Sequence, residues 1–153
     1  TAKKENSDLI YFVEDDYLHF ENSLTDMINT YERVSSQIEK DIIICPCDYP
    51  FNYMSNEKTN ILIGSNQHWR TVQKILCTFM ISKKMLEKYW DNLIKTCEKR
   101  HDPFEKYINE ILLNEIGISP INTLSIHLTN VNSSYGLSPF VDIKKLWDEN
   151  NTS

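Results

Sequence analysis

Three adjacent acidic residues interrupt an apolar and aromatic stretch, LIYFVEDDYLH, at residues 9–19. Glu14, Asp15 and Asp16 repel one another, and a β-strand does not need them. Hard cations such as Mg²⁺ and Mn²⁺ prefer oxygen ligands and often join one or two carboxylates to a substrate phosphate. The triplet therefore predicts a metal–phosphate site, and the alternative is a strand end whose acids are simply solvated.

A second group of chemically versatile residues, His68, Trp69 and Arg70, follows the loop sequence GSNQ. The face of a tryptophan ring stacks well on a sugar, and a guanidinium pairs with a phosphate or a carboxylated sugar. These residues therefore predict a substrate-binding segment. In the alternative interpretation, Trp69 anchors the loop to the core and Arg70 belongs to a surface ion pair.

The elements that must position these residues alternate between strands and helices. Short apolar runs rich in β-formers predict strands at 8–13, 41–45 and 61–64, a longer β-rich segment at 71–81 and a strand-like segment at 118–128. Helical spacing of apolar residues predicts helices at 24–34, 85–94, 104–112 and 141–147, with Gly117 ending the third. This order predicts a single α/β domain over residues 1–153, with a mixed sheet.

The composition excludes several classes of protein. A chain of 153 residues with 41% apolar residues, 25% charged residues and a net charge of −6 is typical of a globular domain. It has no basic stripe, so nucleic acid is not an expected partner, and no apolar stretch approaches the length of a membrane span. Four scattered cysteines without zinc-site spacing predict reduced thiols and favour a cytoplasmic location.

The order of several short motifs resembles that of the GT-A glycosyltransferases, specifically bacterial and viral sugar transferases related to the large family-2 class. In chain order the motifs are FVEDDYLH (12–19), DYP (48–50), HWRTV (68–72) before CTF (77–79), HD (101–102), SIH (125–127) and SPFVD (138–142). The resemblance covers residues 8–147. EDDYLH and HWRTV together, in this order, are much more specific than either motif alone.

The resemblance implies a metal-dependent enzyme of polysaccharide biosynthesis that moves a sugar from a nucleotide-diphosphate donor to a hydroxyl of a glycan or other acceptor, with inversion. Its acidic triplet would be the DxD-like element that binds Mn²⁺ or Mg²⁺, with Asp16 as the direct ligand, Asp15 as a helper and Glu14 orienting the ribose or a neighbouring group. His127 would complete the metal ligands. The alternative is a core histidine bonded to a backbone carbonyl.

The general base implied by the resemblance is Asp102, because an inverting transfer needs a carboxylate near the acceptor hydroxyl. Asp102 directly precedes Pro103. An aspartate in that position also suits a purely structural role as the N-cap of the following helix. Glu105 is the rival base, since a shift of one helical turn would exchange the two acids.

Members of this family carry a Rossmann-like, nucleotide-binding half before the DxD strand, whereas this sequence begins close to that strand. The expectation is therefore a partial GT-A domain, the acceptor-side portion of a glycosyltransferase. An exposed sheet edge would favour association with the missing N-terminal segment or a homo-oligomer.

Two other functions remain open at this point. The first is a non-catalytic carbohydrate-binding or assembly module that uses His68, Trp69 and Arg70 together with the aromatic loop at 49–53. The second is a metal-dependent phosphohydrolase built on the acids at 14–16. A phosphohydrolase is less well supported, because two-metal sites usually need several acidic clusters and only one is evident.

Overall fold

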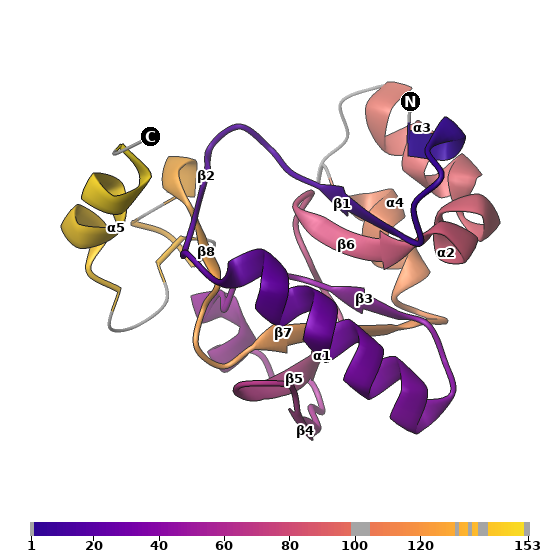
Figure 1. The fold of residues 1–153 in the computed structure, drawn as a ribbon, viewed down its shortest axis with the longest axis horizontal. Coiled ribbons are helices and arrows are strands. Elements are labelled where there is room, and N and C mark those ends of the chain that lie inside the picture. The colour runs from indigo at the N-terminus through magenta and orange to yellow at the C-terminus, as the bar shows by residue number, and fades with distance from the viewer. Residues whose placement is uncertain (1, 99–104, 131, 135, 138–140, 152–153) are drawn as a thin grey trace.

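The computed structural model describes residues 2–98, 105–130, 132–134, 136–137 and 141–151. Its centre is a six-stranded mixed sheet with the spatial order β1-β6-β3-β7-β5-β4 (Figure 1). These strands are β1 (Leu9–Phe12), β3 (Ile42–Ile44), β4 (Ile61–Ile63), β5 (His68–Val72), β6 (Phe79–Ser82) and β7 (Ile116–Pro120). β3 and β7 run parallel, and the other neighbouring strands are antiparallel.

Helices flank this sheet on both faces, which establishes the mixed α/β class. The α-helices are α1 (Ser23–Ile38), α2 (Lys83–Lys88), α3 (Trp90–Glu98), α4 (Lys106–Ile111) and α5 (Ile143–Asn150). Three short 3₁₀ turns complete the structure: η1 (Ala2–Lys4), η2 (Pro50–Tyr53) and η3 (Leu128–Asn130). None of the helices in the described residues combines the length and apolarity needed to cross a membrane.

The two sides of β3 face different halves of the core, as the two-residue period of a strand requires. Ile42 and Ile44 pack with Met27, Tyr31 and other residues of α1. Ile43 points to the opposite side, where it joins the apolar residues of α2, α3 and α4. β3 is therefore buried on both faces, which explains why its sequence is a continuous run of isoleucines rather than an alternating pattern.

A second, two-stranded sheet lies beside α5 and positions the candidate site (Figure 1). It consists of β2 (Tyr17–His19) and β8 (Ser125–His127), which run antiparallel with Tyr17 opposite His127. The backbone N–H of Leu128 also donates to the carbonyl oxygen of Asp16 at 2.9 Å. This pairing brings the acidic triplet next to the end of β8.

The predicted segment 71–81 and the predicted helix at 85–94 are each divided in the structure. The β-rich segment 71–81 is not one strand, because the chain leaves the sheet between β5 and β6. There the backbone N–H of Ile75 donates to the Oδ1 of Asn109 at 2.9 Å. The helix predicted at 85–94 is likewise two helices, since Tyr89 between them has the non-helical angles φ −109° and ψ 22°. Ser82 does cap the first of these, accepting from the N–H of Met85 at 3.0 Å.

Gly117 was predicted to end a helix, and this is wrong. It lies inside β7, between Ile43 on one neighbouring strand and Val72 on the other. A Cβ atom there would lie 2.6 Å from the Cδ2 of Leu112. The glycine is therefore explained by the close packing of the Leu112 side chain against the sheet.

Cys45, Cys47, Cys77 and Cys97 are all free in the structure, and Cys45 and Cys47 are buried.

Candidate metal centre

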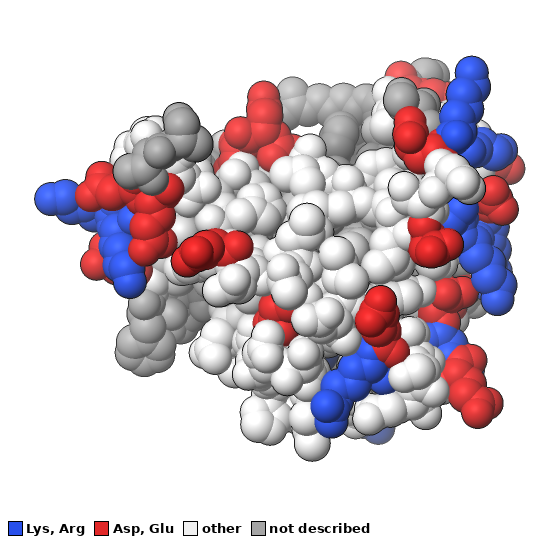
Figure 2. All heavy atoms as spheres, in the orientation of Figure 1, with Lys and Arg blue, Asp and Glu red and all other residues white. Residues whose placement is uncertain are grey.

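The loop that joins β1 to β2 carries two of three side chains that converge into a single cluster. The ligating atoms of Glu14, Asp16 and His127 all lie within 4.8 Å of one another. Glu14 and Asp16 come from this loop, whereas His127 comes from the last position of β8. In Figure 2, acidic side chains project from the surface over the β1–β2 connection.

Asp16 is the hub of the cluster. Its Oδ2 lies 2.8 Å from the Nε2 of His127 and also accepts a hydrogen bond from the hydroxyl of Thr129. Burial acts to raise the pKa of Asp16, but the bonds from Thr129 and His127 outweigh it and hold that pKa below its ordinary value. Asp16 is therefore a carboxylate at neutral pH.

Glu14 differs from Asp16 in its electrostatic state. Burial raises its pKa, and the negative charge of Asp16 raises it further. The loop is held in place here by the Glu14 backbone N–H, which donates to the Oγ1 of Thr78 at 3.0 Å. A second charge beside Asp16 is unfavourable unless a cation compensates for it, so the two acids form a place where positive charge is stabilised.

The imidazole of His127 is fixed by an aromatic neighbour. The ring of Tyr17 stacks on it, with ring centroids 4.7 Å apart and an interplanar angle of 9°. The Tyr17 hydroxyl in turn lies 2.7 Å from the hydroxyl of Tyr49 within the core. The stacking sets the plane of the His127 ring, and the Nε2 of that ring points toward Asp16 in the cluster.

The donor set fits a divalent cation. Two carboxylates and one imidazole are ligands that Mn²⁺ accepts, and a predominantly oxygen set also suits Mg²⁺. One buried acceptor, the Oδ1 of Asp16, has no hydrogen-bond partner among the described residues. A buried carboxylate oxygen without a partner is costly, and a bound cation would satisfy it.

The structure brings together some of the predicted site residues and separates others. Asp16, His127 and Glu14 meet, whereas Asp15, predicted as a helper ligand, is exposed and lies outside the cluster. Thr129 and Tyr17 were missed by the sequence analysis. Tyr17 lies inside the EDDYLH motif, so its position next to Asp16 was the available signal. Thr129 follows His127 by two residues in a polar segment that carries no recognisable pattern.

Two of the three residues in the HWR segment, which was predicted to bind substrate, are buried. The segment forms the start of β5, and the side chain of Trp69 is completely buried between the sheet and α1, so its ring has no face available for a sugar. Arg70 is also buried, and its Nη2 lies 2.9 Å from the Oδ1 of Asp48. Trp69 therefore lies in the core, as the alternative interpretation predicted. That interpretation also placed the ion pair of Arg70 on the surface, whereas the pair is buried. Of the three residues, His68 alone is exposed.

Asp102, the general base implied by the resemblance, lies outside the described residues, as do His101 and Pro103. Its rival Glu105 is described, directly before α4. The pKa of Glu14 is raised mainly by burial and by the charge of Asp16, and the carboxylate of Glu105 raises it by a smaller amount. Glu105 therefore acts electrostatically on the cluster.

Comparison of the chain with protein-family models, with curated proteins and with solved structures finds no match in any of the three.

Proposed function

We propose that this chain acts as a metal-dependent glycosyltransferase of the GT-A type. It would use a nucleotide-diphosphate sugar as donor and a hydroxyl of a glycan or other molecule as acceptor, with inversion. One observation carries the proposal: Asp16 and His127 are 111 residues apart in sequence, yet their side chains meet at 2.8 Å beside Glu14. This convergence at the end of a sheet strand has the ligand types expected for a cation that binds a diphosphate.

In this proposal Asp16 and His127 hold Mn²⁺ or Mg²⁺, and Glu14 is the third ligand. When bound, the cation supplies Lewis-acid stabilisation of the charge that develops on the departing nucleoside diphosphate. Thr129 orients the carboxylate of Asp16, and Tyr17 fixes the plane of the His127 ring. These two neighbours keep the ligand atoms in place before any substrate arrives, which reduces the reorganisation needed on binding.

The general base of this proposal is an acid on the acceptor side, Asp102 or its rival Glu105. The base would accept the proton of the acceptor hydroxyl as the hydroxyl oxygen attacks the sugar. Glu105 is favoured by its electrostatic effect on the pKa of Glu14, whereas Asp102 is favoured by the family resemblance. Separate substitution of each acid distinguishes the two assignments.

The competing functions have less support. A carbohydrate-binding module built on Trp69 loses its main platform, because that ring is buried. A phosphohydrolase with two metal ions would need more carboxylates than the two that converge in the described residues. The glycosyltransferase proposal needs a single cation, which three side chains together with substrate oxygens and water can hold.

The test is thermal unfolding with MnCl₂ alone, and with MnCl₂ plus UDP or GDP, each with and without EDTA. We expect a rise in Tm that requires Mn²⁺ and that Asp16→Ala abolishes. Asp15→Ala is the matched control, because Asp15 is the adjacent acid outside the cluster. No rise with Mn²⁺ would contradict the metal centre. A rise with Mn²⁺ that neither nucleotide increases would contradict a complete donor site within these residues.

A further inference from the structure

A cavity lies apart from the metal centre, between α5 and neighbouring loops. It has a volume of about 510 Å³. Its walls come from the segment after β3, the β7–β8 connection, Phe20 before α1, and α5. None of Glu14, Asp16 and His127 lines it. Its size falls within the range of roughly 300–1,000 Å³ that is typical of small-molecule sites.

An aromatic ring held in a fixed position lines this cavity. The hydroxyl of Tyr53 donates to the Oδ2 of Asp48 at 2.6 Å and accepts a hydrogen bond from the Nη2 of Arg70. The guanidinium carbon of Arg70 also lies 4.1 Å from the centroid of the Tyr53 ring, so it covers one face. Tyr53 nevertheless remains 55% exposed and lines the cavity.

The buried ion pair beneath Tyr53 has no obvious purpose in stability alone. The Arg70 and Asp48 side chains are only 7% and 1% exposed, and burying two charges costs about as much free energy as their attraction returns. What the pair does achieve is geometric. It locks both the hydroxyl and the ring plane of Tyr53, so this exposed aromatic surface loses little entropy when a ligand stacks on it.

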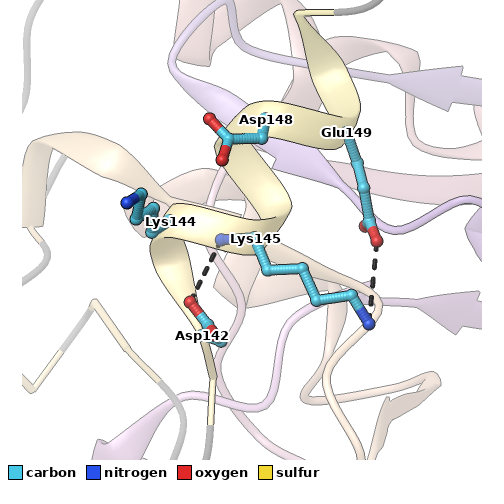
Figure 3. A pocket seen from close by; sticks show the side chains of 5 residues that line it. All are labelled: Asp142, Lys144, Lys145, Asp148 and Glu149. Atoms are coloured by element: carbon cyan, nitrogen blue, oxygen red, sulfur yellow. Dashed lines mark hydrogen bonds and ion pairs between the residues drawn. The ribbon is translucent and has the colours of Figure 1, made fainter.

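Polar groups suited to hydroxyls surround the open part of the cavity. Asn122 has an exposed side chain, and its backbone N–H is held by the Oε1 of Gln67 at 2.8 Å. Asp142 accepts from the backbone N–H of Lys145 through Oδ1, which leaves its second carboxylate oxygen for a ligand. Figure 3 shows this bond and the contact of the Lys145 ammonium with Glu149, which measures 3.7 Å.

The charge balance of the lining selects among ligands. Arg70 neutralises Asp48, and Glu149 offsets Lys145, so Asp142 remains as an uncompensated acid. An anionic ligand such as a phosphate is therefore disfavoured. A purely apolar ligand would leave the polar rim unsatisfied.

We infer that this cavity binds a neutral hexose unit of a saccharide. The apolar C–H face of the sugar ring stacks on Tyr53, and its hydroxyls bond to the Asn122 amide and to the free oxygen of Asp142. Phe20, Ile121 and Leu146 supply the apolar wall. The site works without the cation, and it places the carbohydrate-binding surface of this chain at Tyr53 rather than at Trp69.

The experiment is ¹H–¹⁵N NMR of the full chain of 18.1 kDa in EDTA, titrated with the methyl glycosides of glucose, galactose and mannose and with N-acetylglucosamine. We expect at least one sugar to shift the backbone amides of Tyr53, Asn122 and Lys145 in a saturable manner. Tyr53→Leu should weaken that binding at least tenfold. Asn122→Ala should weaken it measurably, and it removes only an exposed side chain, so it decides the outcome if Tyr53→Leu does not fold.

Two controls separate this inference from the proposed function. Tyr107→Leu changes another tyrosine that lies under a cation but lines a different part of the molecule, and it should leave sugar binding intact. Asp16→Ala removes the metal centre and should also leave it intact. The inference is overturned if no sugar causes saturable shifts, or if Asn122→Ala and a folded Tyr53→Leu bind as well as the unchanged chain.

Discussion

The Nε2 of His127 lies 2.8 Å from the Oδ2 of Asp16 because β2 and β8 pair with Tyr17 directly opposite His127. The contact joins the loop after β1 to β8, the last strand of the described residues. Neither strand alone assembles the ligand set, since Glu14 and Asp16 come from one side of the pairing and His127 from the other. The pairing of the two short strands therefore brings the residues of the candidate site together.

Thr129→Val should weaken Mn²⁺ binding without unfolding the chain. The hydroxyl of Thr129 donates to the Oδ2 of Asp16, and removing it frees the carboxylate to rotate. Loss of an outer partner of a metal ligand typically reduces affinity about 10–100-fold. Titration of Mn²⁺ followed by electron paramagnetic resonance measures the effect. Thr25→Val, at an exposed position of α1, is the matched control, and equal affinities for both variants would contradict the assigned role of Thr129.

Breaking the buried ion pair of Asp48 with Arg70 should destabilise the protein strongly. Arg70→Met leaves the Asp48 carboxylate buried without its counter-charge, and this costs roughly 3–5 kcal/mol in the free energy of unfolding. Adding Asp48→Asn should restore part of the loss, since the uncompensated charge is then removed. Urea denaturation of both variants measures this.

The exposed pair of Lys145 with Glu149 provides the control for that experiment. Glu149→Gln should change the free energy of unfolding by no more than about 1 kcal/mol, because solvent screens the pair. An effect of Arg70→Met as small as that of Glu149→Gln would contradict the assignment of a buried charge on Asp48 that depends on Arg70.

Gly64→Ala should destabilise the fold through a clash with the fully buried Trp69. A Cβ at position 64 would lie 2.3 Å from the Cδ1 and Nε1 of Trp69 and 2.9 Å from the carbonyl oxygen of Gln67. Trp69 is fully buried and has no space to move away. Overpacking of this kind costs about 1–3 kcal/mol, and thermal denaturation would detect it.

Gly117→Ala serves as the comparison for Gly64→Ala. Its nearest contact would be the Cδ2 of Leu112 at 2.6 Å, the end of a flexible side chain that can rotate. We therefore expect Gly64→Ala to lower Tm more than Gly117→Ala does. The reverse order would show that the Trp69 side of the core is the more adaptable one.

The stability of the protein should fall as the pH falls through the ordinary titration range of histidine, with His19 as one contributor. Burial lowers the pKa of His19 in the folded state, and its Nε2 lies 2.6 Å from the hydroxyl of Tyr11. Below pH about 6.5 the unfolded chain binds a proton that the folded chain takes up only at lower pH. Protonation therefore favours unfolding, and the free energy of unfolding rises again with pH.

His19→Gln tests this prediction, because glutamine keeps an acceptor for Tyr11 but does not titrate. Urea denaturation at pH 7.5 and at pH 5.5 gives the pH dependence of each protein. The unchanged chain should lose more stability between these pH values than the variant does. Identical pH profiles for the two proteins would show that His19 does not contribute to the pH dependence of stability.

The sequence predicted the large elements well, for identifiable physical reasons. β3 is a short continuous apolar run, and the apolar residues of α1 recur at helical spacing. Both elements lie where these patterns predicted them. β2 was missed, because three residues after an acidic triplet show no period. The break between β5 and β6 was missed as well, since the loop between them contains Ile75 and Leu76, which are buried like strand residues.

The candidate site could be predicted only in part. The acidic triplet suggested a cation by its composition, but its partner His127 depended on the family resemblance. The pairing of β2 with β8 spans nearly the whole chain, so no local pattern encodes it. Had HWRTV been interpreted as a strand, the alternation of side chains would have predicted that Trp69 and Arg70 lie on opposite faces of β5.

The long-range pairings have a consequence for how the protein folds. Leu9 pairs with Ser82, Ile42 with Ile116 and Tyr17 with His127, so each pairing closes a long loop before it gains any contact energy. Chains dominated by such distant contacts cross a high entropic barrier and fold slowly. The pairing of β2 with β8 closes the longest loop of the three, and we expect it to form last. Affinity for a cation would then appear only at the end of folding, so Mn²⁺ uptake by the refolding chain would serve as a clock for its final step.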